Sequence, residues 1–61
     1  MDIKERIKIA DKLKRMNQLV VNGVLCVVVD NMVHVDEDLD NLPNPMPWKT
    51  FINQYLNSGR N

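Results

Sequence analysis

The chain has few of the residues that usually carry catalytic or metal chemistry. Its 61 residues include one cysteine, one histidine and two glycines. A single cysteine excludes an internal disulfide and a cysteine-based zinc site. The sequence also lacks a glycine-rich phosphate loop, a dinucleotide fingerprint and a nucleophile elbow. We therefore expect no enzyme activity, no cofactor and no metal site.

Long hydrophobic runs are also absent. No apolar run reaches the ~20 residues that a membrane-spanning helix needs. The N-terminal segment alternates charged and apolar side chains, so no signal peptide is expected and the predicted setting is the cytoplasm, without membrane contact. The hydrophobic content of 44% argues against disorder and predicts one small domain over residues 1–61. Such a chain buries only about 60% of its unfolded surface, and small domains often gain stability by oligomerising.

The most apolar part of the chain, residues 19–35, is interrupted only at two dipeptides. Asn22 and Gly23 tolerate the positive φ angles of a type I′ turn, and Asp30 and Asn31 serve the same purpose less well. This pattern predicts a three-stranded antiparallel meander, or a two-stranded hairpin if the short first strand is irregular. The predicted strands are residues 19–21, 24–29 and 32–35.

Placing these dipeptides in two-residue loops fixes the strand register and therefore the two faces of the sheet. One face has no strongly polar side chain and is assigned to the core: Leu19, Val21, Val24, Cys26, Val28, Val33 and Val35. The other face is mostly apolar as well: Gln18, Val20, Leu25, Val27, Val29, Met32 and His34. A small sheet that is apolar on both faces needs two covers, and this chain has little material for both.

Residues 2–17 are predicted to form an amphipathic helix, with Asp2 as its cap. The apolar stripe of this helix contains Ile3, Ile7, Ile9, Ala10, Leu13 and Met16. Because this stripe is needed to cover the core face of the sheet, the overall prediction is an α+β fold. A second helix is expected to pack beside the first or to fold round to the opposite face of the sheet.

The C-terminal half combines a polar loop with that second helix. Residues 36–46 contain four acidic residues and two of the three prolines of the chain, and Leu39, Leu42 and Met46 are expected to anchor this loop. The alternative is that this segment is a docking peptide for a proline-reading domain, but its prolines do not have the PxxP spacing that such domains recognise. Pro47 suits a first helical turn, and residues 47–57 are predicted to be helical, with Ser58 and Gly59 as a stop. The apolar positions of this helix are Trp48, Phe51, Ile52, Tyr55 and Leu56.

Two candidate chemical groups are interpreted as structural. Cys26 and His34 fall on opposite faces of the sheet, which prevents a direct hydrogen bond between them, and apolar neighbours would raise the pKa of the thiol. The acidic residues Asp36, Glu37, Asp38 and Asp40 lack the mid-loop glycine of an EF-hand, so they are interpreted as solvated loop charges.

The formal net charge is zero, but basic residues concentrate in the first helix. Lys4, Lys8, Lys12 and Arg15 follow one another at helical spacing and form a stripe that could track nucleic-acid phosphates. No stacking aromatic or net positive charge supports this interpretation. A dimeric nucleic-acid-binding regulator is therefore the alternative function, and a solvated helix face is the structural interpretation.

The preferred hypothesis is a small non-catalytic adaptor or regulator that binds protein, with a homodimer as its expected form. Small inhibitors carried by phages or plasmids are similar in size, although this is an analogy only. The homodimer would use the second sheet face or exchanged C-terminal helices, and a structural subunit of a larger assembly is a third possibility. Candidate interface residues are Leu25, Val27, Val29, Met32, His34, Trp48 and Tyr55.

Overall fold

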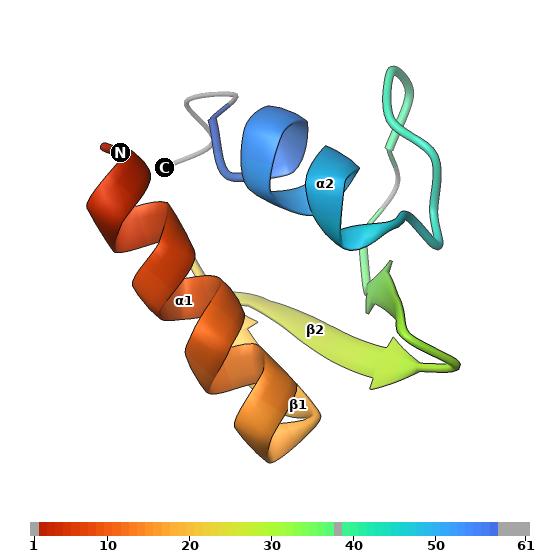
Figure 1. The fold of residues 1–61 in the computed structure, drawn as a ribbon. Helices are drawn as coiled ribbons and strands as arrows, with labels where there is room; N and C mark the ends of the chain where they lie inside the picture. Colours follow the sequence, from red (N-terminus) through yellow and green to blue (C-terminus); the bar gives the residue numbers. More distant parts are fainter. Residues whose placement is uncertain (1, 38, 58–61) are drawn as a thin grey trace.

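The computed structural model describes residues 2–37 and 39–57 and has two layers (Figure 1). One layer is an antiparallel sheet of three strands, and the other contains the N-terminal helix α1 and the short C-terminal helical segment. The α+β prediction is confirmed. Both helical segments lie on the same face of the sheet, so the second helix packs beside the first rather than on the opposite face.

Helix α1 spans Ile3–Met16, and the residues that flank it, Asp2 and Asn17, cap its two ends. The Asp2 side chain accepts a hydrogen bond of 2.9 Å from the backbone N–H of Glu5, which satisfies an otherwise unpaired amide of the first turn. Asn17 ends the helix at φ 63°, and its N–H donates to the Leu13 carbonyl at 2.8 Å.

The buried stripe of α1 is narrower than its apolar stripe. Ala10 and Leu13 are buried and Ile9 is half-buried, because only this part of the helix faces the core. Ile3 and Ile7 are each 47% exposed, and Met16 is 56% exposed. Apolar periodicity therefore located the helix correctly but predicted a broader contact than the small sheet can supply.

The sheet has the predicted order and register. Strands β1 (Gln18–Val21), β2 (Val24–Val29) and β3 (Met32–Val35) are adjacent in sequence order. Leu19 pairs with Cys26, and Val28 pairs with Val33. The first strand is regular, so the alternative of a two-stranded hairpin does not occur.

Both hairpin turns adopt the left-handed backbone conformation that their residues tolerate. Asn22 and Gly23 have φ of 51° and 80°, and Asp30 and Asn31 have φ of 53° and 62°. Positive φ at both central positions is the requirement of a type I′ turn, whose twist matches that of the flanking strands. Local turn chemistry therefore sets the register, and the register decides which side chains enter the core.

The outer edge of β3 is covered by the chain that follows it. The backbone N–H of Val33 donates to the Met46 carbonyl at 2.8 Å, and the N–H of Met46 donates to the Val33 carbonyl at 2.9 Å. The Asn44 side chain continues this pairing: its Oδ1 accepts from the N–H of Val35 at 2.9 Å, and its Nδ2 donates to the Val35 carbonyl at 2.6 Å. The Asn44 side chain and the Met46 backbone thus make the hydrogen bonds to β3 that a fourth strand would otherwise make.

The C-terminal helix is not the regular helix that was predicted for residues 47–57. It begins as α2 (Trp48–Thr50) and continues as the π-helix η1 (Phe51–Tyr55), in which the N–H of Leu56 donates to the Phe51 carbonyl at 2.9 Å. The wider π turn, with its i→i+5 bond, allows Phe51, Tyr55 and Leu56 all to be buried. The predicted stop at Ser58 and Gly59 lies outside the described residues.

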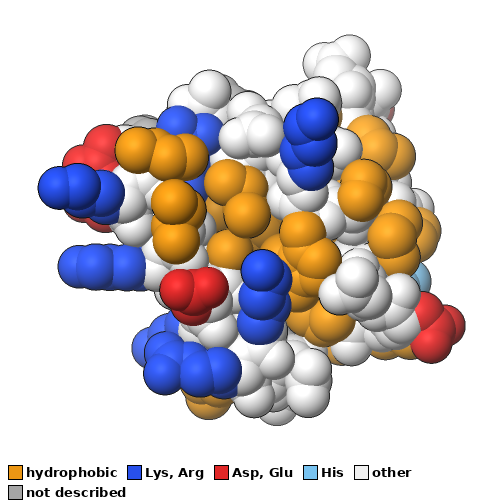
Figure 2. All heavy atoms as spheres, viewed as in Figure 1, with side chains coloured by type: hydrophobic (Ala, Val, Ile, Leu, Met, Phe, Trp, Pro, Cys, Tyr) orange, Lys and Arg blue, Asp and Glu red, His pale blue; other side chains and the backbone are white. Residues whose placement is uncertain are grey.

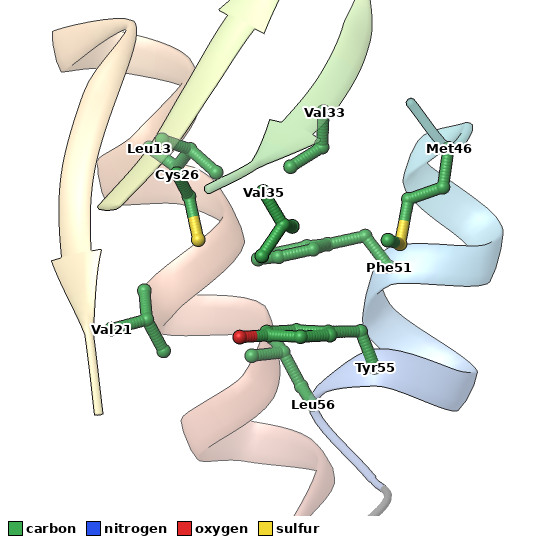
Figure 3. Packing of buried hydrophobic residues seen from close by; sticks show 9 residues of the cluster. All are labelled: Leu13, Val21, Cys26, Val33, Val35, Met46, Phe51, Tyr55 and Leu56. Carbon is green, nitrogen blue, oxygen red and sulfur yellow. The ribbon is translucent and has the colours of Figure 1, made fainter. Parts of the chain in front are cut away.

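The core lies between the sheet and the two helical segments (Figure 3). Phe51 stacks on Tyr55 with ring centroids 5.5 Å apart and an interplanar angle of 12°. Leu39 and Leu42 are partly buried against the same cluster, so the predicted anchoring of the loop is confirmed. The buried members are Leu13, Val21, Cys26, Val33, Val35, Met46, Phe51, Tyr55 and Leu56.

Candidate functional site

The outer face of the sheet, opposite the helices, carries three of the exposed large hydrophobic side chains of the described chain, and three others lie on α1. Val20 is 63% exposed, Val29 is 48% exposed and Leu25 is 41% exposed. Val27, Met32 and His34 on the same face are half-buried, and Gln18 is exposed. Since both helical segments pack on the core face, no described element covers this surface.

A shallow depression lies at one side of the outer face. Its volume is about 350 Å³ and it is open to solvent. Apolar side chains and the polar groups of three residues line it together, so it offers an apolar floor with hydrogen-bonding groups nearby. The lining residues are Leu25, Val27, His34, Val35, Asp36 and Asn44.

Cys26 and His34 lie on opposite faces of the sheet, as the register predicted. Cys26 is completely buried in the core, whereas His34 is half-buried on the outer face. Burial, with a smaller contribution from the Glu37 carboxylate, raises the pKa of the Cys26 thiol to about 11. The thiol is therefore protonated at neutral pH, which makes it a structural group rather than a nucleophile.

Two of the candidate interface residues lie away from the outer face. Tyr55 is only 3% exposed, stacks on Phe51 and donates a hydrogen bond to a Glu37 carboxylate oxygen at 3.3 Å, so it belongs to the core and not to a free surface. Trp48 is half-buried on the helix side, where its Nε1 donates to Asn31 Oδ1 at 2.9 Å. The candidate interface is therefore reduced to its five strand residues.

The structure adds one residue to this surface. Val20 is the most exposed of the large hydrophobic side chains on the outer face, although the sequence-based interface did not include it. The signal was present, because the register already placed Val20 on that face beside Leu25. The sequence did not show how far Val20 would be exposed, because that depends on which face of the sheet the helical segments cover.

The basic stripe of α1 is exposed along its whole length. Figure 2 shows Lys and Arg side chains gathered on the α1 side of the molecule, with hydrophobic side chains between α1 and the C-terminal helical segment. The stripe comprises Lys4, Lys8, Lys12 and Arg15, all of which are exposed. Lys14 is separate from it and lies with its Nζ 5.0 Å from the centroid of the Trp48 ring.

The acidic loop shows no ligand cluster in the part of the chain that is described. Asp36 and Asp40 are exposed and Glu37 is half-buried, while Asp38 lies outside the described residues. Within residues 2–37 and 39–57, no three His, Cys, Asp or Glu side chains come together in a way that could hold a metal ion. Over the same residues, no helix is long and apolar enough to cross a bilayer.

Comparisons with family models, with curated proteins and with solved structures give no match for this chain.

Proposed function

We propose that this chain is a small non-catalytic adaptor or regulator that binds protein through the outer face of its sheet. The supporting observation is that Val20, Leu25 and Val29 are all more than 40% exposed on one continuous strand surface. Exposed apolar patches of this kind usually mark a protein interface in a folded chain. The homodimer expected from the sequence belongs to the same proposal.

The size of the outer face limits what it can bind alone. Three strands with a longest strand of six residues give a face of about 14 Å by 20 Å, or ~300 Å² in plan. A stable protein interface buries about 800 Å² on each partner. A partner must therefore extend beyond one sheet face, or two copies of the chain must present their faces together.

Lysine substitutions provide the test. Val29→Lys places a charge on the outer face, and Gln54→Lys places the same charge at an exposed position of η1. The tagged chain and both variants are expressed in cells, and circular dichroism first establishes that each is folded. Proteins that co-purify with the wild type and with the Gln54→Lys control should be reduced at least tenfold with Val29→Lys.

Two results would count against the outer face as a binding surface. The same proteins could co-purify equally with all three chains, which would place the contact elsewhere. Alternatively, Val29→Lys could unfold the protein while Gln54→Lys does not, which would show that Val29 contributes to the core and not to an interface.

Nucleic-acid binding through α1 is the second candidate, supported by the uninterrupted exposure of Lys4, Lys8, Lys12 and Arg15. Four phosphate contacts predict that the logarithm of the affinity falls with the logarithm of salt concentration with a slope of about −3.6 for duplex DNA. Fluorescence anisotropy with duplex and single-stranded oligonucleotides at 20–200 mM salt measures this slope. Absence of binding at the lowest salt concentration would eliminate this candidate.

A further inference from the structure

The two edges of the sheet differ in whether their backbone groups are hydrogen-bonded. The outer edge of β3 is paired with the Met46 backbone and the Asn44 side chain. The outer edge of β1 has no such partner among the described residues. Strand β1 also lacks the proline, lysine or bulge with which proteins usually protect an exposed edge. It is therefore the one strand edge of the described sheet that is available for pairing.

The hydrogen-bonding pattern between β1 and β2 shows which backbone N–H and C=O groups of β1 face its free edge. The N–H of Val28 on β2 donates to the Asn17 carbonyl at 2.9 Å, so Asn17 points its backbone groups toward β2. Because backbone direction alternates along a strand, the N–H and C=O groups of Gln18 and Val20 point outward. Both residues are exposed, and Val20 has no charge that would oppose a second strand.

We propose that two copies of the chain pair antiparallel through β1 and form one continuous six-stranded sheet. Gln18 of each copy pairs with Val20 of the second copy, which satisfies the outward N–H and C=O groups of both residues. Leu19 lies at the twofold axis. This inference rests on the self-association in the proposed function, but it uses the edge of the sheet and leaves the outer face free.

The position of α1 fits this dimer. Helix α1 lies over β1 and β2 (Figure 1), while α2 begins just after Met46, which is bridged to β3. With strands about 4.8 Å apart, a helix centred between β1 and β2 stands ~5 Å from the twofold axis. Two such helices are then ~10 Å apart, which is the spacing of packed helices.

In the proposed dimer, one side of α1 faces the same side of α1 in the second copy, and the charges on this side are complementary. Lys14 contacts Trp48, and at about 100° per residue Glu5, Ile9 and Lys12 lie roughly 140–180° around the helix from Lys14. They therefore face away from the C-terminal helical segment and toward the free edge of β1. In an antiparallel pair of helices, Ile9 meets Ile9 of the second copy, and Glu5 meets Lys12 of the second copy.

The dimer also enlarges the proposed binding surface. The twofold axis is perpendicular to the sheet, so both outer faces point in the same direction. Together they form an apolar surface of ~600 Å² in plan, twice that of one copy. Pairing at β1 therefore brings the outer face closer to the size that a stable protein interface requires.

A proline substitution tests the edge pairing directly. Val20→Pro removes an N–H that points outward, and proline is tolerated on an edge strand when its missing N–H faces solvent. Val20→Ala keeps that N–H and is the matched control. Sedimentation velocity should show a dimer for the wild type and for Val20→Ala, and at least a hundredfold weaker dimerisation for Val20→Pro.

Charge reversal gives a second test that leaves the strand unchanged. Glu5→Lys and Lys12→Glu each place like charges across the twofold axis, and two symmetric contacts predict about tenfold weaker dimerisation for each variant. The double variant restores opposite charges and should dimerise within about twofold of the wild type. Amide exchange supplies an independent readout: Gln18 and Val20 amides are protected in the dimer and become exchangeable in Val20→Pro.

Three outcomes would overturn the edge-paired dimer. The wild type could remain monomeric at every concentration, which would leave the outer-face experiment with Val29→Lys unaffected. The Val29→Lys variant could be monomeric while Val20→Pro still dimerises, which would indicate face-to-face packing and support the proposed function without the edge pairing. The Gln18 and Val20 amides could exchange at unprotected rates in a dimer, which would place its interface elsewhere.

Discussion

The side chain of Asn44 takes the place of a strand residue, and its removal should measurably destabilise the fold. It makes two hydrogen bonds to the backbone of Val35, at 2.9 Å and 2.6 Å, and Val35 is only 3% exposed. A hydrogen bond contributes a net stability of about 0.5–1.5 kcal/mol. Asn44 itself is exposed, so water can replace part of the lost pairing. We expect Asn44→Ala to lower the free energy of unfolding by about 1.5 kcal/mol.

Urea denaturation followed by circular dichroism measures this change. For a domain of this size, a denaturant dependence of about 1 kcal/mol/M predicts that the urea midpoint falls by ~1.5 M with an unchanged slope. A chain of 61 residues has a total stability of roughly 3–9 kcal/mol, so the variant should still fold. Asn41→Ala, at an exposed position of the same loop, is the matched control.

Urea midpoints of Asn44→Ala and Asn41→Ala within ~0.3 M of each other would show that the two bonds to Val35 contribute little to stability. A specific sign of the mechanism is faster amide exchange at Val35 in Asn44→Ala. If the midpoint falls but the Val35 amide stays protected, the loss of stability has a different origin.

Three further predictions concern the core, the first helix and the cysteine. Phe51→Ala should cost about 3–5 kcal/mol, because the fully buried ring packs on two other aromatic side chains, and thermal unfolding that differs little from the wild type would contradict this. Asp2→Ala should cost about 1 kcal/mol in urea denaturation, whereas Asp2→Asn, which keeps the capping oxygen, should cost much less. Because the folded thiol of Cys26 has a pKa of about 11, above its unfolded value, its stabilising contribution is complete below pH ~8.5 and is lost as the pH rises toward 11. The decline in stability between pH 9 and 11 should be smaller in Cys26→Ala, and an identical pH dependence would show that the thiol is not its cause.

Several features of this protein followed from the sequence because they depend on neighbouring residues. Asn22 and Gly23 prescribe a turn with positive φ, and a two-residue turn leaves only one register for the strands beside it. The side chains then alternate, so the core face and the outer face were both predictable. The capping of α1 by Asp2 is local in the same way.

Other features depend on contacts between distant parts of the chain, and only the tertiary structure decided them. The apolar pattern of residues 47–57 did not reveal that η1 is a π-helix or that Tyr55 is buried, because both depend on how the C-terminal segment fits against the sheet. The pairing of Asn44 with Val35 is likewise invisible in a sequence pattern.

The availability of the outer face was the decisive point that the sequence left open. Its apolar composition was evident from the register, but its exposure depends on which side of the sheet receives the second helix. The link from Met46 along β3 into α2 places that helix beside α1, on the core face. Alternation along the strands therefore determined which residues form the outer face, and the path of the C-terminal segment determined that they meet solvent.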